Sequence, residues 1–469
     1  MKKSKLFIIC LTVLWLSVNT VSLFGQNRSQ IDETLSKYLD IQNKRIGFSG
    51  TVLVTDDDGI ISHQTIGLAS RELEVPFSID SRFKIASITK SFTGLLITLA
   101  EKEGKLQLGN NLETYFPKLE DETWKQITIK QLLSHTSGMP HWSGFTEYWT
   151  IKSWLPLTQE QVLEEIFNME LLFEPGTSAS YSSPAYYLLA VILEKLYAAS
   201  YKNILEEKIL IPLQLKHTNA FDGLSVIPNM SSGYHLISDD SLIAAPSRNM
   251  ATMKGGGHLY ATATDLNSWC RSFLSNDIWN DSILHAIFNP VTNFKMQHKK
   301  GAFYGRGWYI SEKNASGSVA YHIGGGTFGF SSKAVIYPSR KISIVILSNV
   351  SFLPMDDVLW KDIEKIVFER SFELPKEYPE VLHLTSHELK KFSGIYKSKK
   401  GLNLEIIFHQ DKLFTKLGRN PPFEIYPQSQ NTFFSKKIEI EFTFTTNDGG
   451  GVTGLATNGM GRVDHFEKQ

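Results

Sequence analysis

The fold of this chain is decided by the stretch Phe83-Lys84-Ile85-Ala86-Ser87-Ile88-Thr89-Lys90, which leads straight into an apolar run from Ser91 to Ala100. The run predicts a buried helix that ends at Gly104. Residues three apart lie on one face of a helix, so Ser87 Oγ and Lys90 Nζ can meet there. A serine at a helix N-terminus also lies beside backbone N–H groups, which favour the oxyanion that forms when a serine attacks a carbonyl.

Lys90 can act as a base only if its surroundings remove its proton. A free lysine is protonated at neutral pH, and burial or a neighbouring cation would have to lower its pKa. Serine and lysine also occur three residues apart by chance in many helices. Ser87 and Lys90 are therefore a candidate nucleophile and base that need support from the rest of the chain.

A second feature is the tyrosine in Tyr181-Ser182-Ser183-Pro184, which follows the turn sequence Glu174-Pro175-Gly176-Thr177. Pro184 suits the first position of a helix, so we expect Ser183 to be its N-cap and the helix to run to about Tyr197. A tyrosine just before a helix can project its hydroxyl into a cleft. The alternative is a buried tyrosine that only packs the loop.

A third feature is the glycine-rich stretch Tyr321-His322-Ile323-Gly324-Gly325-Gly326-Thr327-Phe328-Gly329-Phe330. Glycines in a strand let a ligand or another backbone come close. The alternative is a glycine-rich turn with an incidental histidine. A phosphate-binding loop is disfavoured, because neither the strand–loop–helix order nor the lysine-serine pair of such loops follows.

Strand patterns at both ends of the main region predict an α+β fold. Gly50–Thr55 and Ile60–Ile66 flank an Asp-Gly hairpin signal, and Ser332–Tyr337 and Ile342–Ser348 flank a second turn. Helices and loops fill the sequence between these pairs. We therefore expect one antiparallel sheet that distant parts of the chain close, rather than alternating parallel units.

The two ends of the chain differ from this region. Met1–Gly25 has a basic start, an apolar run and small residues, the order of a secretory signal peptide. It predicts a periplasmic or secreted protein, with an uncleaved membrane anchor as the alternative. After the proline-containing stretch Glu373–Pro379, short β-rich runs separated by turns predict a small all-β barrel or sandwich.

Composition excludes several classes of function. The formal charge is zero, with 48 basic and 48 acidic residues, so nothing points to nucleic acid as a partner. Of the two cysteines, Cys10 lies in the signal segment, so no internal disulfide is possible after cleavage. The histidines form no metal-ligand spacing, and neither a metal nor a cofactor is expected.

The order Ser-x-x-Lys, Tyr-x-Ser and His-x-Gly resembles that of the serine β-lactamase and penicillin-binding protein superfamily. Ile127–Pro140 and Gly255–Leu266 are similar to stretches of the class C β-lactamase-like hydrolases. The resemblance covers about residues 30–350. The C-terminal region resembles the lipocalin-like β domain that such hydrolases often carry. The implied division is a signal peptide over 1–25, a β-lactamase-like domain over 26–372, a linker over 373–387 and a β-barrel over 388–469.

The resemblance implies a sheet flanked by a helical subdomain and a role for each motif residue. Ser87 would be the acylated nucleophile, and Lys90 and Tyr181 would share proton transfer. The backbone N–H groups of Ser87 and Gly325 would form the oxyanion hole. The residues that would bind substrate are Ser183, His322 and Gly324.

Two departures from the family pattern narrow the expected activity. Ser183 stands where relatives commonly carry asparagine, and His322 where β-lactamases usually carry lysine. A mostly neutral histidine would anchor a substrate carboxylate weakly. We therefore expect an esterase or a D-amino-acid peptidase acting on a small ester, peptide or β-lactam-like substrate. The alternatives are a D,D-carboxypeptidase of cell-wall metabolism and a penicillin-binding sensor or scaffold that does not turn over.

Overall fold

The structure is a computed structural model, in which the chain divides into two compact units. It describes residues 28–145, 147–148, 151–238, 241–246, 248–275, 277–296, 302–312, 317–368, 372–399, 401–417, 422–436, 440–459 and 462–469. The predicted signal peptide lies outside these residues. Residues 28–46 are helical. In the described part of the chain, no helix combines the length and apolar character that a membrane span requires.

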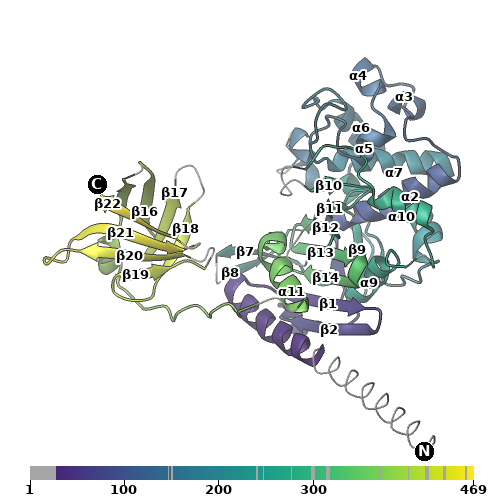
Figure 1. Ribbon diagram of the computed structural model, residues 1–469. Coiled ribbons are helices and arrows are strands. Elements are labelled where there is room, and N and C mark those ends of the chain that lie inside the picture. The colour runs from purple at the N-terminus through teal and green to yellow at the C-terminus, as the bar shows by residue number, and fades with distance from the viewer. Residues whose placement is uncertain are drawn as a thin grey trace, which may run out of the picture. The chain divides into compact units, whose positions relative to one another are not determined.

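A seven-stranded sheet organises the larger unit, in the order β10-β11-β12-β13-β14-β1-β2 (Figure 1). All its neighbouring strands are antiparallel, and β1 pairs with β14 through Gly50 opposite Ser348. Distant parts of the chain therefore close one sheet, which confirms the predicted α+β class. The strands are β1 (Gly50–Asp56), β2 (Gly59–Ile66), β10 (Phe303–Tyr304), β11 (Tyr309–Ser311), β12 (Ala320–Thr327), β13 (Phe330–Tyr337) and β14 (Ile342–Ser348).

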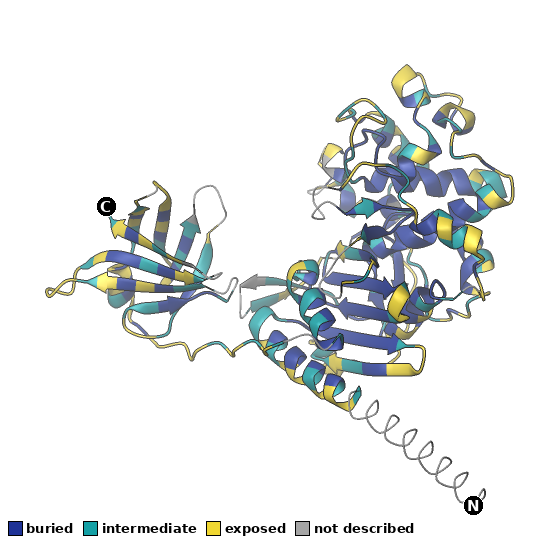
Figure 2. Cartoon of the chain, viewed as in Figure 1, coloured by how far each residue is buried: buried dark blue, intermediate teal, exposed yellow. Residues whose placement is uncertain are grey.

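Both faces of the central strands are covered, and β13 is buried along its whole length (Figure 2). Helix α9 (Ala263–Arg271) packs against β13, β14 and β1 on one face. Helix α11 (Trp360–Val367) contacts the other face, where Trp360 Nε1 donates to Tyr337 OH at 2.7 Å. Burial on both faces explains why these strands read as continuous apolar runs.

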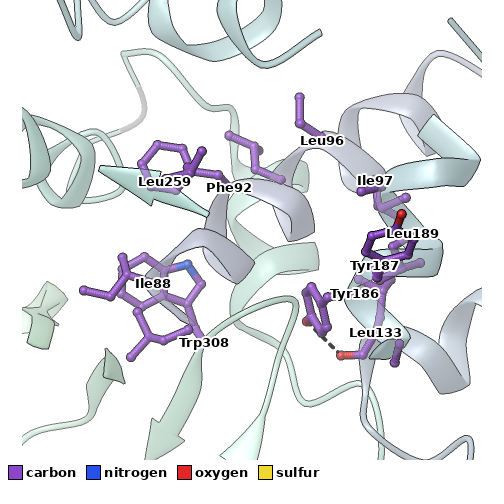
Figure 3. Close-up of a cluster of buried hydrophobic side chains, with 14 of the residues drawn as sticks. Ile88, Phe92, Leu96, Ile97, Leu133, Tyr186, Tyr187, Leu189, Leu259 and Trp308 are labelled. Atoms are coloured by element: carbon purple, nitrogen blue, oxygen red, sulfur yellow. Dashed lines mark hydrogen bonds between the residues drawn. The ribbon is translucent and has the colours of Figure 1, made fainter. Parts of the chain in front are cut away.

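Two long helices, α2 (Thr89–Lys102) and α7 (Ser183–Tyr197), pack together and form the centre of the helical part. Figure 3 shows their apolar side chains in one cluster with Ile88, Leu133, Leu259 and Trp308. The remaining helical elements of this unit are α3 (Leu112–Tyr115), α4 (Glu122–Lys125), α5 (Ile129–Leu133), α6 (Gln159–Phe167), α8 (Tyr201–Leu205) and α10 (Asp281–Phe288). Short strands β5 (Phe83–Lys84), β9 (Leu259–Ala261) and β6 (Asn219–Ala220) form a small second sheet.

The C-terminal unit contains a closed eight-stranded barrel, in which β15 pairs with β22. The closed barrel confirms the predicted all-β domain. Its interior is filled by aromatic side chains, with the rings of Phe392, Phe433 and Phe444 within 5.4 Å of one another. The strands are β15 (Gly394–Ser398), β16 (Asn403–His409), β17 (Lys412–Leu417), β18 (Phe423–Pro427), β19 (Thr432–Phe434), β20 (Ile440–Thr446), β21 (Val452–Gly459) and β22 (Arg462–Lys468), and they follow α12 (Ser386–Lys390).

Candidate active site

Ser87 lies where strand β5 turns into helix α2. A single 3-10 turn, η1 (Ala86–Ile88), joins the two, and the Ile85 N–H donates to Leu259 O of β9 at 3.0 Å. Ala86 has a φ of 47°, which is uncommon for a residue other than glycine. Such strain persists only where the surroundings hold the backbone in place, and it is frequent at functional sites. The turn presents Ser87, half-buried, at the start of α2, as the sequence predicts.

Lys90 is completely buried and its Nζ contacts three oxygen atoms. They are Gly256 O at 2.7 Å, Ser183 Oγ at 2.9 Å and Ser87 Oγ at 3.3 Å. Within the described residues, no carboxylate forms an ion pair with this lysine. Burial therefore lowers the pKa of Lys90 well below its ordinary value.

In the neutral form of Lys90, which its burial favours, these three contacts allow the following arrangement of hydrogens. The Gly256 carbonyl can only accept, so one N–H donates to it. The second N–H donates to Ser183 Oγ, the next shortest contact. The lone pair is then left for Ser87, whose O–H can donate to Nζ. This is the arrangement that a general base requires, because base and nucleophile lie within hydrogen-bond reach.

Tyr181 also contacts Ser87. Burial raises the pKa of the Tyr181 hydroxyl to about 12, although hydrogen bonds with Ser87 and Ser183 act in the opposite direction. Its ring also faces Lys90 Nζ at 4.8 Å from the centroid. A hydroxyl with this pKa is protonated at neutral pH, whereas the pKa of Lys90 is lowered. Of the two, Lys90 is the better resting base and Tyr181 the better proton donor.

Two histidines hold the segment that carries Tyr181. His135 Nδ1 accepts from the backbone N–H of Ser182 at 3.2 Å, and His141 Nδ1 accepts from that of Ser183 at 3.2 Å. The His135 ring also lies 4.6 Å from the Tyr181 ring. Neither histidine was among the predicted site residues. Both histidines fix the direction in which Tyr181 and Ser183 face.

The N-cap predicted for α7 is wrong by one residue. Ser182, not Ser183, caps the helix: its Oγ accepts from the Ala185 N–H at 3.3 Å. Pro184 then occupies the second helical position, where the N–H that proline lacks would have no partner within the helix. The shift leaves the Ser183 hydroxyl for Lys90. With 2% of its surface exposed, Ser183 belongs to the proton network rather than to an open substrate surface.

A second layer of hydrogen bonds holds the residue next to Gly256, whose carbonyl Lys90 contacts. Thr93, one turn beyond Lys90 on the same helix face, donates to Gly255 O at 2.7 Å. Its oxygen lies 2.7 Å from the Tyr201 hydroxyl, which must donate because the Thr93 proton is already used. Lys254, next in the chain, pairs with Glu194 at 2.9 Å. Thr93 and Gly256 were not among the predicted site residues, although Thr93 lies at the spacing that placed Lys90 beside Ser87.

The predicted oxyanion hole is sterically consistent with the backbone. Strand β12 packs against η1, and a Cβ built on Gly325 would lie 2.2 Å from Ile85 O and 2.9 Å from Ser87 N. Only glycine lets the strand approach the nucleophile this closely. Ser332 on β13 donates to Ile85 O at 2.9 Å, which ties the sheet to the turn before Ser87. The structure therefore brings Ser87, Lys90, Tyr181, Ser183 and Gly325 together.

His322 does not join this group. It is three positions from Gly325 on one strand, so the two residues face opposite sides of the sheet. Its Nδ1 lies 2.9 Å from Lys333 Nζ, its Nε2 lies 3.0 Å from Ser311 Oγ, and only 3% of its surface is exposed. An ammonium can only donate, so Nδ1 accepts and the imidazole is neutral. The expectation that His322 lines the cleft is therefore corrected by the burial of its ring and by its two partners, Lys333 and Ser311.

Lys333, also fully buried, supplies a positive charge beside His322 but does not present it to the cleft. Its Nζ forms a short ion pair with Asp356 and lies 4.2 Å from the centroid of the Trp360 ring. A buried lysine in this setting is paired and hydrogen-bonded. Lys333 was not among the predicted site residues, because a lysine within an apolar strand pattern indicates a position that faces solvent.

A cavity of about 390 Å³ adjoins the site, and we call it the β12 cavity. Gly324, Gly325 and Gly326 form one wall, the segment from Phe352 to Asp357 forms another, and Tyr181 lines it as well. Gly324 is thus the one predicted substrate-binding residue that lines an open space. Within the described residues, histidine, cysteine, aspartate and glutamate side chains form no group of three or more suited to a metal ion.

Comparison with known proteins gives matches over most of the chain. The profile of the family described as Beta-lactamase matches residues 31–367. Penicillin-binding protein 4* of Bacillus subtilis (strain 168) is 24% identical over 443 residues, which are 90% of this chain and 95% of that protein.

Two solved structures share the fold at low identity. The octameric penicillin-binding protein homologue from Pyrococcus abyssi is 21% identical with a TM-score of 0.65, over 94% of this chain and 99% of that chain. The D-amino acid amidase from Ochrobactrum anthropi SV3, complexed with D-phenylalanine, is 18% identical with a TM-score of 0.61, over 73% of this chain and 97% of that chain.

Proposed function

The chain belongs to the Beta-lactamase family, and on that premise we propose that it is an exported serine hydrolase. It acts through an acyl-enzyme on an ester or amide, as an esterase or a D-amino-acid peptidase, rather than as an efficient β-lactamase. The observation that carries this proposal is the geometry of Lys90. Lys90 is completely buried, its Nζ lies 3.3 Å from Ser87 Oγ, and burial lowers its pKa, so that the neutral amine can accept the Ser87 proton.

Acylation begins when the substrate carbonyl oxygen enters the space between the backbone N–H groups of Ser87 and Gly325. Ser87 Oγ attacks the carbonyl carbon while Lys90 takes its proton. The developing oxyanion accepts from the two N–H groups, an interaction stronger in the transition state than in the ground state. Both donors are backbone groups of rigid elements, so they need little reorganisation.

Collapse of this intermediate releases the alcohol or amine. Tyr181, protonated at neutral pH, gives its proton to the leaving oxygen or nitrogen and recovers one from Lys90 through the shared hydrogen bonds at Ser87 and Ser183. A water molecule then attacks the acyl-enzyme, with Lys90 again accepting the proton. Ser87 leaves as the restored hydroxyl, so the cycle consumes only water and uses no cofactor.

The charges around the site favour substrates that need no cation to anchor a carboxylate. His322 is neutral and buried, and Lys333 is engaged by Asp356. A D,D-carboxypeptidase or an efficient β-lactamase recognises a carboxylate on its substrate. At the His322 position, this site lacks the cation that would bind such a carboxylate. The amidase among the similar structures acts on D-amino acids by its name, which supports D-amino-acid amides or esters as a substrate class for this chain.

Turnover of p-nitrophenyl esters by the purified protein tests the proposal. Wild type should hydrolyse them and label with a fluorophosphonate, whereas Ser87→Ala should do neither. Ser225→Ala, which changes an exposed serine in another loop, is the matched control and should behave as wild type. Labelling by fluorescent penicillin without any turnover would favour the sensor or scaffold instead. Equal activity in wild type and Ser87→Ala would refute the nucleophile.

We propose that export depends on the first 25 residues, whose basic, apolar and small segments have the order of a signal peptide. The mature protein should then begin after Gly25 and fractionate outside the cytoplasm. N-terminal sequencing of the protein from its native host checks the cleavage, and a mature chain that retains Met1 would contradict it.

A further inference from the structure

The β12 cavity reaches the reacting centre through Tyr181 and Gly325, and neither Ser87 nor Ser183 lines it. Its volume of about 390 Å³ lies within the range of small-molecule sites. A substrate group in this cavity must be joined to a carbonyl held at Gly325. The same group must also lie beside Tyr181, which donates the proton in our mechanism.

The position of the β12 cavity identifies the part of the substrate, on one side of the scissile bond, that it would hold. The leaving oxygen or nitrogen receives its proton from Tyr181, so the group attached to it lies on the Tyr181 side of the carbonyl. The acyl substituent projects from the opposite side of the carbonyl carbon. The cavity that contains Tyr181 is therefore placed for the alcohol or amine portion of the substrate.

Phe352 forms the outer rim of the cavity and has two unusual properties. It has a φ of 62°, an outlier for a bulky residue, and 83% of its surface is exposed. Neighbouring contacts hold it there: the Leu353 N–H donates to Ser331 Oγ at 3.3 Å, and the His235 ring stacks on it at 6.0 Å. Folding alone gains little from an exposed aromatic ring in a strained conformation.

The polar residues of the cavity disfavour a charged leaving group. Asp356 and Asp357 both line the cavity. Their cationic neighbours are Lys333, which is fully buried behind Asp356, and Lys361, 3.5 Å from Asp357 and exposed to water. A leaving group that carries a carboxylate would meet two carboxylates in this cavity, a repulsive contact that discriminates against it.

We propose that the β12 cavity is a leaving-group site that selects an uncharged aromatic alcohol or amine, with Phe352 as the residue that determines this specificity. The proposal rests on the acyl-enzyme mechanism proposed above. The leaving aromatic ring packs on the Phe352 ring while Tyr181 protonates the departing atom. The strained backbone keeps the Phe352 ring at the rim before substrate arrives, so little ordering is needed on binding.

Three esters of one acyl group test the site: benzyl, methyl and carboxymethyl. Benzyl alcohol and methanol are similar in acidity, so a difference between them reports contacts rather than chemistry. We expect kcat/KM for the benzyl ester to exceed that for the methyl ester about tenfold, and the carboxymethyl ester to be the poorest. Since all three form the same acyl-enzyme, kcat should be equal wherever deacylation is rate-limiting.

Phe352→Ala should lower kcat/KM for the benzyl ester about five- to tenfold and leave the methyl ester unchanged. Phe352→Tyr should keep the preference, and Phe294→Ala, an exposed aromatic outside the cavity, should have no effect. Equal losses on benzyl and methyl esters, or a change in acyl preference alone, would overturn the leaving-group assignment. Turnover without any benzyl preference would overturn this inference only, whereas no turnover of any ester by wild type would overturn the proposed function with it.

Discussion

Replacing Gly325 by alanine tests the oxyanion hole at one atom. The added Cβ would lie 2.2 Å from Ile85 O and 2.6 Å from Ser332 Oγ, where ordinary contact begins at 3.4 Å. Backbone and β13 confine it on both sides, so strand β12 must move away from Ser87 by roughly 1 Å, a displacement that can cost about 10²-fold in rate. The Gly325 N–H moves with the strand and stops donating to the oxyanion.

The expected loss follows from the donor that is displaced. Removal of one oxyanion-hole donor lowers kcat by about 10²–10³. We therefore expect Gly325→Ala to lower the rate of p-nitrophenyl ester hydrolysis, and of fluorophosphonate labelling, by about that factor. The overpacked contact should also cost about 1–3 kcal/mol of unfolding free energy.

Gly326→Ala is the matched control, because a Cβ at that position meets nothing within 4 Å. It should keep wild-type stability and leave strand β12 in place beside Ser87. Thermal melts of both variants separate a displaced donor from an unfolded domain. A folded Gly325→Ala protein that hydrolyses esters within about threefold of wild type would refute the oxyanion assignment, since one lost donor must cost far more.

Four further predictions follow from the site. Activity should fall as pH falls through the lowered pKa of Lys90, because the protonated amine cannot accept the Ser87 proton. For the same reason, Lys90→Arg should lower the acylation rate, measured by stopped flow, by about 10²–10⁴. Thr93→Val should lower that rate and shift the acid limb to lower pH, because losing the bond to Gly255 O loosens the segment that holds the next carbonyl, Gly256 O, against Lys90, where it favours the ammonium form; Thr93→Ser should restore both, and an unchanged profile counts against this role of Thr93. Lys333→Met should cost about 3–5 kcal/mol in chemical denaturation by leaving the Asp356 carboxylate without its cation, and a loss below about 1 kcal/mol would contradict the buried pair. A chain truncated near Glu377 should still label at Ser87, because the barrel contributes none of the three motifs, and a soluble truncated protein that no longer labels would contradict this.

Local patterns predicted most of the catalytic unit. The strand alternation and hairpin signals gave β1, β2, β13 and β14, and the apolar run after Ser87 gave α2. These elements form where propensity and burial agree, so a single sequence is enough to find them. The same patterns could not choose between Ser182 and Ser183 as the N-cap, because both are good capping residues and only tertiary contact with Lys90 separates them.

Other features depend on partners that are far apart in the sequence. Gly256 contacts Lys90 across 166 residues, and no local pattern marks its carbonyl as a ligand. The barrel strands β18, β21 and β22 are poorly marked in the sequence, because charged, small or proline residues in them depress strand propensity. Closure of the barrel, which pairs every strand on both sides, compensates for that weak propensity.

Mass spectrometry of the trapped intermediate tests the central claim most directly. Wild-type protein mixed with an excess of a p-nitrophenyl ester, quenched in acid during the steady state and digested, should carry the acyl group on the peptide that contains Ser87. Lys90→Arg should carry little acyl group at the same quench time, and Ser87→Ala none. An acyl group on any other residue, or steady-state hydrolysis by Ser87→Ala, would contradict the mechanism.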